Sequence, residues 1–372
     1  MASFNKVMLR KQNSSFIAIS DDIAHALDNL WALPFVDKSI EQLSAENVLQ
    51  YLTSMEADFA MLKWSDALSK GGVIEIVVPN TDYYLTLWQQ ASWSNTDLTD
   101  AESLARQAFA GLWGTQQDGN PRNENYQPYY QDIYKSGYNA ARLQLLLERA
   151  GFCDIQINEV NSELLARANK TMERGERQIT THYDQIRPDH LNRYEFACKT
   201  LGQLTPAHQI VDLACGIGYG SLLLAKETTA SVTGVDIDSA AITHAQQYFS
   251  NKQTHFICED ARFLSLEEQS KDAIVSFETI EHIDFDAELL TMFYKLLKPS
   301  GQLICSTPNQ DVMPFDKQKF KFHIKHYTNT ELTQLLTQAG FKNIQLFAQR
   351  DPVMGKVVVG QDGSFTIAVA TK

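Results

Sequence analysis

The sequence of 372 residues predicts an α/β protein with its ligand site at one edge of a parallel sheet. Short apolar runs of strand length alternate with segments that are apolar at helical spacing, which is typical of strands joined by helical crossovers. One join, Val211–Ser221, is rich in glycine and lies between the apolar runs Gln209–Val211 and Leu222–Ala225. Glycines allow close backbone approach, and the following helix offers unpaired N–H groups, so this turn is predicted to bind a ligand.

The spacing of the glycines in this turn separates several ligand classes. It fits neither the Gly-x-Gly-x-x-Gly pattern of dinucleotide binding nor the Gly-Lys-Ser/Thr ending of a phosphate loop. The remaining pattern, Asp212-x-Ala214-x-Gly216-x-Gly218, resembles motif I of class I S-adenosylmethionine-dependent methyltransferases, although that family usually has glycine at the position of Ala214. An ordinary βα turn is the alternative for the loop alone. By the resemblance, the residues of the turn that bind S-adenosylmethionine, released as S-adenosylhomocysteine, are Asp212, Ala214, Cys215, Gly216, Gly218 and Tyr219.

Acidic residues follow the next two predicted strands. Asp236 ends a β-branched run 20 residues after Gly216, and a carboxylate at this strand tip can accept both hydroxyls of a ribose. The resemblance assigns that role to Asp236, with Ile237 beside it. It also implies that Asp260 and Ala261, after the following strand, contact the adenine edge. For Asp260 alone, a solvated loop acid is the alternative.

A longer apolar run, residues 272–277, is predicted to be a buried parallel strand with a polar tail at its carboxyl end. Ligands of open α/β sheets lie at that edge. Phe277 and Glu278 are therefore expected near the cofactor, whereas Glu281 and His282 are expected to face the substrate.

Histidines near this edge are the candidates for proton transfer. A hydroxyl acceptor needs a general base, and histidine suits neutral pH. His282 is the first choice, with Glu281 or Glu278 orienting it, and His323 is the second, ahead of His326. A structural histidine bonded to a loop carbonyl is the alternative. No carboxylate cluster requires Mg²⁺, so no metal is expected.

A segment before the glycine turn narrows the resemblance. Residues 172–177 read Met-Glu-Arg-Gly-Glu-Arg, and residues 190–197 read His-Leu-Asn-Arg-Tyr-Glu-Phe-Ala. Together with the later motifs, they are similar to a subgroup of methyltransferases found in pathways for bacterial surface polysaccharides. The resemblance spans about residues 172–350 and implies that Arg193 and Tyr194 cover the methionine end of the cofactor; a surface helix with a solvated Arg193 is the alternative.

Two parts of the chain resemble each other. Residues 69–82 and 298–311 both read as turn, strand and Pro-Asn-x-Asp, and residues 146–157 and 335–346 share Ala-Gly-Phe before an apolar run. The first copy lacks the glycine turn and has Gln50-Tyr51 where the second has Glu281-His282. Chance recurrence is the alternative.

These patterns predict three parts. Residues 1–165 form a truncated, degenerate methyltransferase-like domain without a cofactor site, starting with a strand at 15–20 and a helix at 23–30 and carrying an aromatic-rich insertion at about 84–136. Residues 166–205 form a helical linker or lid. Residues 206–372 form the catalytic domain, with the Rossmann-like seven-stranded fold that the resemblance implies.

Composition limits the partners and the compartment. The net charge of −13 argues against nucleic acid or an anionic membrane as the main partner. The five cysteines form no pattern of disulfides or metal ligands, and no apolar run spans a bilayer, so a cytoplasmic protein is expected.

The acceptor is expected to be a sugar or glycan-biosynthesis intermediate, methylated on oxygen. A quinone-type ring, a carboxylate or an amine are alternatives, as is a decayed cofactor-binding scaffold; homodimerisation through the first half is possible.

Overall fold

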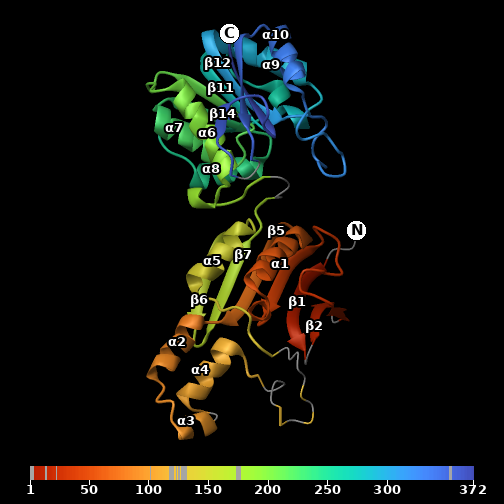
Figure 1. The fold of residues 1–372 in the computed structure, drawn as a ribbon, viewed down its shortest axis with the longest axis vertical. Coiled ribbons are helices and arrows are strands. Elements are labelled where there is room, and N and C mark those ends of the chain that lie inside the picture. Colours follow the sequence, from red (N-terminus) through yellow and green to blue (C-terminus); the bar gives the residue numbers. More distant parts are fainter. Residues whose placement is uncertain are drawn as a thin grey trace. The chain divides into compact units, whose positions relative to one another are not determined.

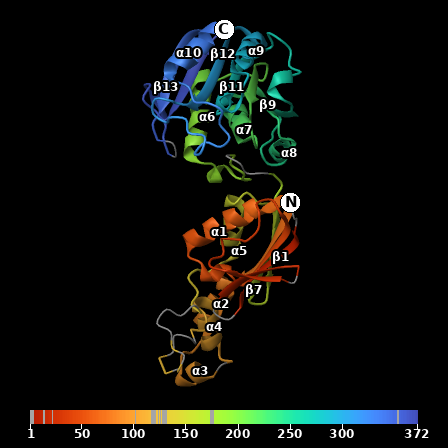
Figure 2. The same ribbon diagram turned by 90° about the vertical axis from the view of Figure 1, so that its right-hand side faces the viewer.

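The computed structural model describes residues 4–12, 15–21, 23–100, 102–116, 121–122, 124, 126, 132–172, 177–351 and 354–372. The chain divides into two compact units, Met1–Gly175 and Glu176–Lys372, each with its own sheet (Figures 1 and 2). Among the described residues, no helix is both long and apolar enough to cross a bilayer.

The first unit is built on a seven-stranded sheet in the order β3-β2-β1-β4-β5-β7-β6. The central strands β1, β4 and β5 pair in parallel. The strands outside them, β2 and β3 on one side and β7 and β6 on the other, pair antiparallel. The strands are β1 (Phe4–Gln12), β2 (Ser15–Ser20), β3 (Ile23–Leu27), β4 (Ile40–Glu46), β5 (Leu68–Pro79), β6 (Cys153–Val160) and β7 (Glu163–Asn169). The helices are η1 (Leu49–Tyr51), α1 (Ser54–Ala67), α2 (Thr81–Gln90), α3 (Asn95–Thr99), α4 (Leu104–Trp113) and α5 (Ala140–Arg149).

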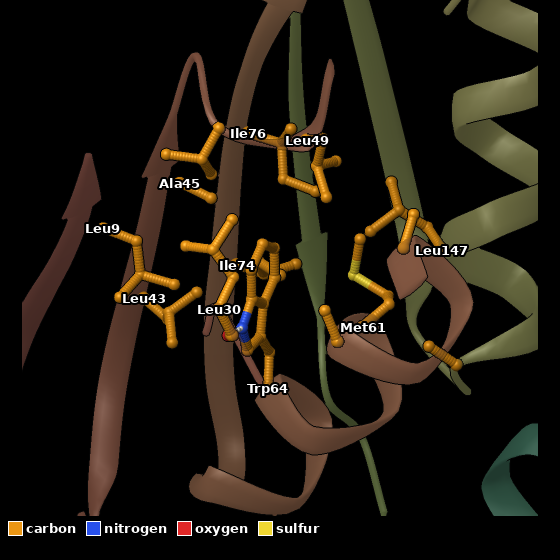
Figure 3. Packing of buried hydrophobic residues seen from close by; sticks show 14 of the residues in the cluster. Leu9, Leu30, Leu43, Ala45, Leu49, Met61, Trp64, Ile74, Ile76 and Leu147 are labelled. Carbon is orange, nitrogen blue, oxygen red and sulfur yellow. Dashed lines mark hydrogen bonds between the residues drawn. The ribbon is translucent and has the colours of Figure 1, made fainter. Parts of the chain in front are cut away.

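The core of this unit lies between α1 and the sheet. Trp64 and Met61 of α1 pack with Leu43 and Ile74 of the central strands, as Figure 3 shows. The Trp64 indole N–H donates to the Leu30 carbonyl over 2.6 Å, so the largest buried ring also has its polar atom satisfied.

One element of the first unit differs from the sequence prediction. The strand at 15–20 is confirmed as β2, but the helix expected at 23–30 is wrong, because Ile23–Leu27 form strand β3. Ser20 pairs with Ile23, and Asp21 has a φ of +47°, which suits a tight hairpin turn. Cross-strand pairing with β2 overrides the helical spacing of the apolar residues.

The aromatic insertion contains helices α2 to α4, whose rings pack on one another. Trp88 lies 4.0 Å from Trp93 and 4.8 Å from Trp113 between ring centroids. These rings therefore contribute to the packing of a small helical layer. Residues 101, 117–120, 123, 125 and 127–131 of the insertion lie outside the described residues.

The second unit has an eight-stranded sheet in the order β10-β9-β8-β11-β12-β15-β13-β14. The first five strands are parallel, and β15 pairs antiparallel with both β12 and β13. Its strands are β8 (Gln209–Leu213), β9 (Ser231–Asp236), β10 (Thr254–Cys258), β11 (Lys271–Phe277), β12 (Leu297–Pro308), β13 (Lys342–Gln349), β14 (Val357–Val359) and β15 (Phe365–Thr371). Its helices are η2 (Tyr183–Gln185), α6 (Pro188–Leu201), α7 (Tyr219–Thr228), α8 (Ser239–Tyr248), η3 (Ala261–Phe263), η4 (Ile280–His282), α9 (Asp286–Leu296) and α10 (Asn329–Gln338).

This is the Rossmann-like methyltransferase fold that the sequence predicted, with seven strands and the three-residue β14 added at the edge. The division between the units also lies later than the expected residue 165. Strand β7 crosses that position and completes the first sheet, so the first unit extends past it.

Candidate functional site

Four parallel strands, β8, β9, β10 and β11, end at the same edge of the second sheet. The residues that follow them are the ones that the sequence predicts for cofactor binding: Ala214 after β8, Asp236 at the end of β9, Asp260 after β10, and Glu278 after β11. Parallel pairing therefore brings together four segments that are far apart in the chain.

The glycine turn has the backbone that its sequence requires. Gly216 and Gly218 have φ values of +55° and +84°, a region that favours glycine. A Cβ on Gly218 would lie 2.6 Å from the Ala245 side chain, whereas a Cβ on Gly216 would meet nothing within 4 Å. The turn is therefore packed on its inner side and open above Gly216, which is the arrangement that a ligand on the backbone needs.

Ala214 also has a positive φ, +58°. An L-residue is strained in this region, which explains why the methyltransferases that this turn resembles usually have glycine here. Ala214 is exposed, and its left-handed backbone costs about 1–2 kcal/mol relative to glycine.

Asp236 ties the glycine turn to the end of β9. Its Oδ2 accepts the backbone N–H of Gly216 over 2.9 Å, and its Oδ1 accepts that of Asp238, also over 2.9 Å. The side chain is nearly buried, at 5% exposed. A carboxylate has about four acceptor positions, so Asp236 is fixed by the backbone and still has capacity for hydroxyl donors.

A residue to which the sequence analysis assigned no role reaches the same carboxylate. Arg177 donates to Asp236 over 3.1 Å and to Asp238 over 2.7 Å. The Gly-Glu-Arg segment was visible in the sequence, but Arg177 lies 59 residues before Asp236, so spacing alone gave no reason to pair them.

Asp212 supports the turn from below. Its carboxylate is fully buried and accepts the Tyr194 hydroxyl over 3.1 Å and the Ser221 hydroxyl over 2.6 Å. Burial raises the pKa of Asp212 to about 7, against an ordinary value near 4, in spite of these two donors. The predicted residue Asp212 is thus a positioning residue beneath the glycines, and Tyr194 lies directly behind Gly220.

We expect Asp212→Asn to change how stability depends on pH. The folded-state pKa lies above the unfolded one, so between about pH 4 and pH 7 the folded state binds the extra proton. Stability from this group is therefore present below pH 4 and falls as pH rises to 7. Asparagine keeps an acceptor without the charge, so the variant should gain on the wild type between pH 5 and pH 8 in urea unfolding. An equal difference at both pH values would contradict this.

The next strand end carries groups suited to a nucleobase. Asp260 caps η3 and pairs with Arg262, whose hydrogen bonds lower the pKa of the carboxyl to about 2. Ala261 follows it at the start of η3. Ile237 and Phe263 are large apolar side chains left 63% and 76% exposed. Ile237 was predicted from the sequence, whereas Phe263 was not, because no pattern in its segment marks it.

Helix α6 places Arg193 and Tyr194 inside the unit. Arg193 is 2% exposed and donates to Gln349 over 2.7 Å, with Asp189 at 3.5 Å. The alternative of a solvated Arg193 is therefore wrong. Tyr194 packs edge-on against Phe277 at 5.0 Å between ring centroids. Their predicted contact with the methionine end of the cofactor stays a prediction.

Tyr219 and Cys215 are also buried. The Tyr219 hydroxyl lies 3.0 Å from Nδ1 of His190, and the Cys215 backbone N–H donates to the Val235 carbonyl over 3.0 Å. Their side chains pack inside the unit, so any contact with the cofactor from this pair would come through the backbone of the turn.

Past β11 the backbone turns sharply. Glu278 has a φ of +50°, and its Oε1 accepts the Ser306 hydroxyl over 2.6 Å. A strained residue at a strand end is typical of functional sites. Ser306 and the adjacent Thr307, the two residues before β12 ends at Pro308, add hydroxyl groups near this edge.

Three predicted catalytic residues meet beyond Glu278. One potential metal-ligand atom of each residue, a ring nitrogen of His282 and of His323 and a carboxylate oxygen of Glu281, lies within 4.8 Å of the other two. The His282 ring lies 4.6 Å from the His323 ring, almost perpendicular to it. Helix η4 supplies the first two residues, and the loop between β12 and α10 supplies His323, with the Ile324 N–H donating to the Glu281 carbonyl over 2.7 Å. We call these three residues the Glu–His–His cluster.

Comparison with known proteins identifies the second half of the chain. Residues 163–346 match the family model described as a methyltransferase domain. A probable S-adenosylmethionine-dependent methyltransferase of Mycolicibacterium smegmatis is 29% identical over 152 residues, which cover 40% of this chain and 58% of the relative. The chain thus spans little more than half the length of that relative.

The names of other relatives give different methyl acceptors. A phosphoethanolamine N-methyltransferase of Triticum aestivum is 27% identical over 152 residues, covering 38% of this chain and 29% of the relative. A malonyl-[acyl-carrier protein] O-methyltransferase of Priestia megaterium is 35% identical over 99 residues, covering 26% and 36%. Residues 163–346 therefore match a methyltransferase domain, similar to enzymes whose names give S-adenosylmethionine as the cofactor.

Proposed function

We propose that this chain transfers the methyl group of S-adenosylmethionine to a hydroxyl group of a small polar acceptor, such as a sugar or an intermediate of glycan biosynthesis. The observation that carries the proposal is the orientation of His282. Its Nδ1 lies 3.1 Å from the Phe322 carbonyl, which accepts only from N–H. This places the proton on Nδ1 and the lone pair on Nε2, the form that a general base needs.

Two features of the turn suit S-adenosylmethionine: the open backbone above Gly216 and the carboxylate of Asp236, which accepts the Gly216 N–H. S-adenosylmethionine supplies an activated methyl group, whose transfer to oxygen breaks a carbon–sulfur bond and leaves neutral S-adenosylhomocysteine. The protein aligns the acceptor oxygen with that carbon and removes the hydroxyl proton. Nε2 of His282 takes the proton, Nδ1–H stays on the Phe322 carbonyl, and the imidazolium then loses its proton to solvent.

The polar groups at the carboxyl end of this sheet favour a sugar as the acceptor over an apolar, quinone-type ring. Glu278 is half-buried at this edge, and its carboxylate is suited to accept the hydroxyls of a sugar, while the buried Ser306 and Thr307 hydroxyls hold Glu278 and Glu281 in place. The amine acceptor named for the phosphoethanolamine relatives is the second candidate, and an amine that is already neutral needs less help from a base.

We further propose that the first unit is a truncated copy of the second that binds no cofactor. Support comes from strand order: β4-β5-β7-β6 repeats β11-β12-β15-β13 with the same parallel and antiparallel pairings. Matching isolated bridges, Asn80–Tyr138 and Asn309–Tyr327, follow the two long strands β5 and β12. Gln50 and Tyr51 stand where the second unit has Glu281 and His282, so the first unit lacks the proposed base and its carboxylate neighbour.

The test supplies methyl-labelled S-adenosylmethionine with three acceptor sets, nucleotide sugars, phosphoethanolamine-type amines and quinone-type phenols, and measures label transfer with S-adenosylhomocysteine release. We expect transfer to a sugar hydroxyl. Transfer confined to amines or phenols would replace the proposed acceptor, and cofactor binding without any transfer would favour a decayed scaffold.

A further inference from the structure

The Glu–His–His cluster combines donors that sequence spacing did not bring together. His282 and His323 are 41 residues apart, and no metal was expected from the sequence because no carboxylate cluster required Mg²⁺. In the fold, one donor atom from each of the three residues lies within 4.8 Å of the others. Two imidazoles and one carboxylate form a common donor set for divalent transition metals.

Both imidazoles are held in the form that binds metal. His326 Nδ1 lies 2.6 Å from the Met313 carbonyl, so this nitrogen carries a proton and His326 Nε2 is an acceptor. His323 Nδ1, 2.7 Å from that Nε2, is then the donor, and the His323 lone pair lies on Nε2. His282 is fixed in the same tautomer by the Phe322 carbonyl. Metal-bound histidines are typically oriented by such hydrogen bonds from the second ring nitrogen.

Glu281 supplies the independent observation. Its side chain is fully buried, and Oε1 has no hydrogen-bond partner among the described residues, while Oε2 accepts the Thr307 hydroxyl over 3.2 Å. Oε1 lies 3.9 Å from Nε2 of His282, so the unpartnered oxygen is on the side of the imidazoles. A buried polar atom without a partner costs about 1–3 kcal/mol, and a bound cation would remove that cost.

We propose that Glu281, His282 and His323 bind one divalent first-row transition-metal ion, of which Zn²⁺ is the representative. Metal–ligand bonds of about 2.0–2.2 Å bring ligand atoms to about 3.3 Å from one another, so distances within the cluster have to shorten by up to about 1.5 Å. Histidine nitrogens favour this class of ion over Mg²⁺, which prefers oxygen ligands and keeps its waters.

A catalytic role for this ion rests on the proposed function, the transfer of a methyl group to a hydroxyl. Three protein ligands leave at least one coordination position open, as in catalytic zinc sites. The acceptor hydroxyl takes that position, its pKa falls, and its proton leaves to solvent. Nε2 of His282 is then a ligand, and the metal-free protein retains the slower route in which that nitrogen takes the proton.

The test titrates ZnCl₂ into chelator-treated, full-length protein by calorimetry and records the visible absorption of the protein with CoCl₂. We expect one ion per chain in the wild type. Glu281→Gln and His323→Asn should weaken binding at least about 100-fold and abolish the Co²⁺ bands, whereas His255→Asn, which alters an exposed histidine of β10, should bind as the wild type. Binding of S-adenosylmethionine to each variant shows that it is folded.

The outcomes separate the two proposals. No ion in the wild type, or equal binding in the Glu281 and His255 variants, overturns the metal site. If the metal-free protein still transfers methyl groups to a hydroxyl, the proposed function stands without it. Stoichiometric, cluster-dependent binding in a protein that methylates no acceptor supports the metal site and overturns the proposed function.

Discussion

Asp236→Ala is expected to weaken the binding of S-adenosylmethionine and S-adenosylhomocysteine by about 100-fold or more. A hydrogen bond to a charged acceptor contributes about 1.5–3 kcal/mol, and the ribose is expected to donate to the acceptor position that Gly216, Asp238 and Arg177 leave open. The substitution also leaves the Gly216 N–H without its acceptor, so the glycine turn loses the bond that fixes it to β9. Isothermal titration of both ligands measures the effect.

The matched control for this prediction is Asp238→Asn. Asp238 lies two residues away, shares the ion pair to Arg177 and caps α8 through the Ala240 N–H. Asparagine keeps the cap and removes the charge. Affinity should therefore stay within about threefold of the wild type. Equal losses in the two variants would mean that the net charge of this edge binds the cofactor, and the assigned role of Asp236 would be wrong.

The same titration tests the first unit. One site per chain, lost with Asp236→Ala, agrees with a first unit that binds no cofactor. Two sites per chain would contradict the proposal that this unit is a truncated copy without a cofactor site. The first sheet has no glycine-rich turn after β1, where the second sheet has Gly216 and Gly218 after β8.

Some of the site could be predicted from sequence because its signals are local. Asp236 ends a strand, and the glycines stand between a strand and a helix, so the residue order alone places them at one sheet edge. Strand β3 could not be predicted in the same way. Its spacing of apolar residues suits a helix, and only pairing with β2 makes it a strand.

Interactions between segments that are distant in the chain could not be predicted from the sequence. Arg177 reaches Asp236 across 59 residues, and Arg193 reaches Gln349 across 156. The hydrogen-bond chain from Met313 through His326 to His323 has the same character, because its direction depends on a loop fold that no periodic pattern marks. The sequence could nominate His282 and His323, but their tautomers follow only from the carbonyls near them.

His282→Asn is expected to lower kcat by about 10²- to 10⁴-fold, the usual contribution of a general base. The asparagine amide can still donate to the Phe322 carbonyl in place of Nδ1–H, so the loop keeps its contact while Nε2 is removed. Affinity for S-adenosylmethionine should stay within threefold, because His282 lies beyond the glycine turn and Asp236. Single-turnover label transfer at saturating cofactor measures the chemical step.

The control His255→Asn removes an imidazole from the exposed face of β10 and should leave kcat unchanged. Equal rates for His282→Asn and wild type on a hydroxyl acceptor would show that His282 is structural, held by the Phe322 carbonyl alone. A loss on hydroxyl acceptors with little loss on a neutral amine would support the base role, since only the hydroxyl must give up its proton as the bond to carbon forms. The two acceptors together therefore separate proton removal from alignment, which both reactions share.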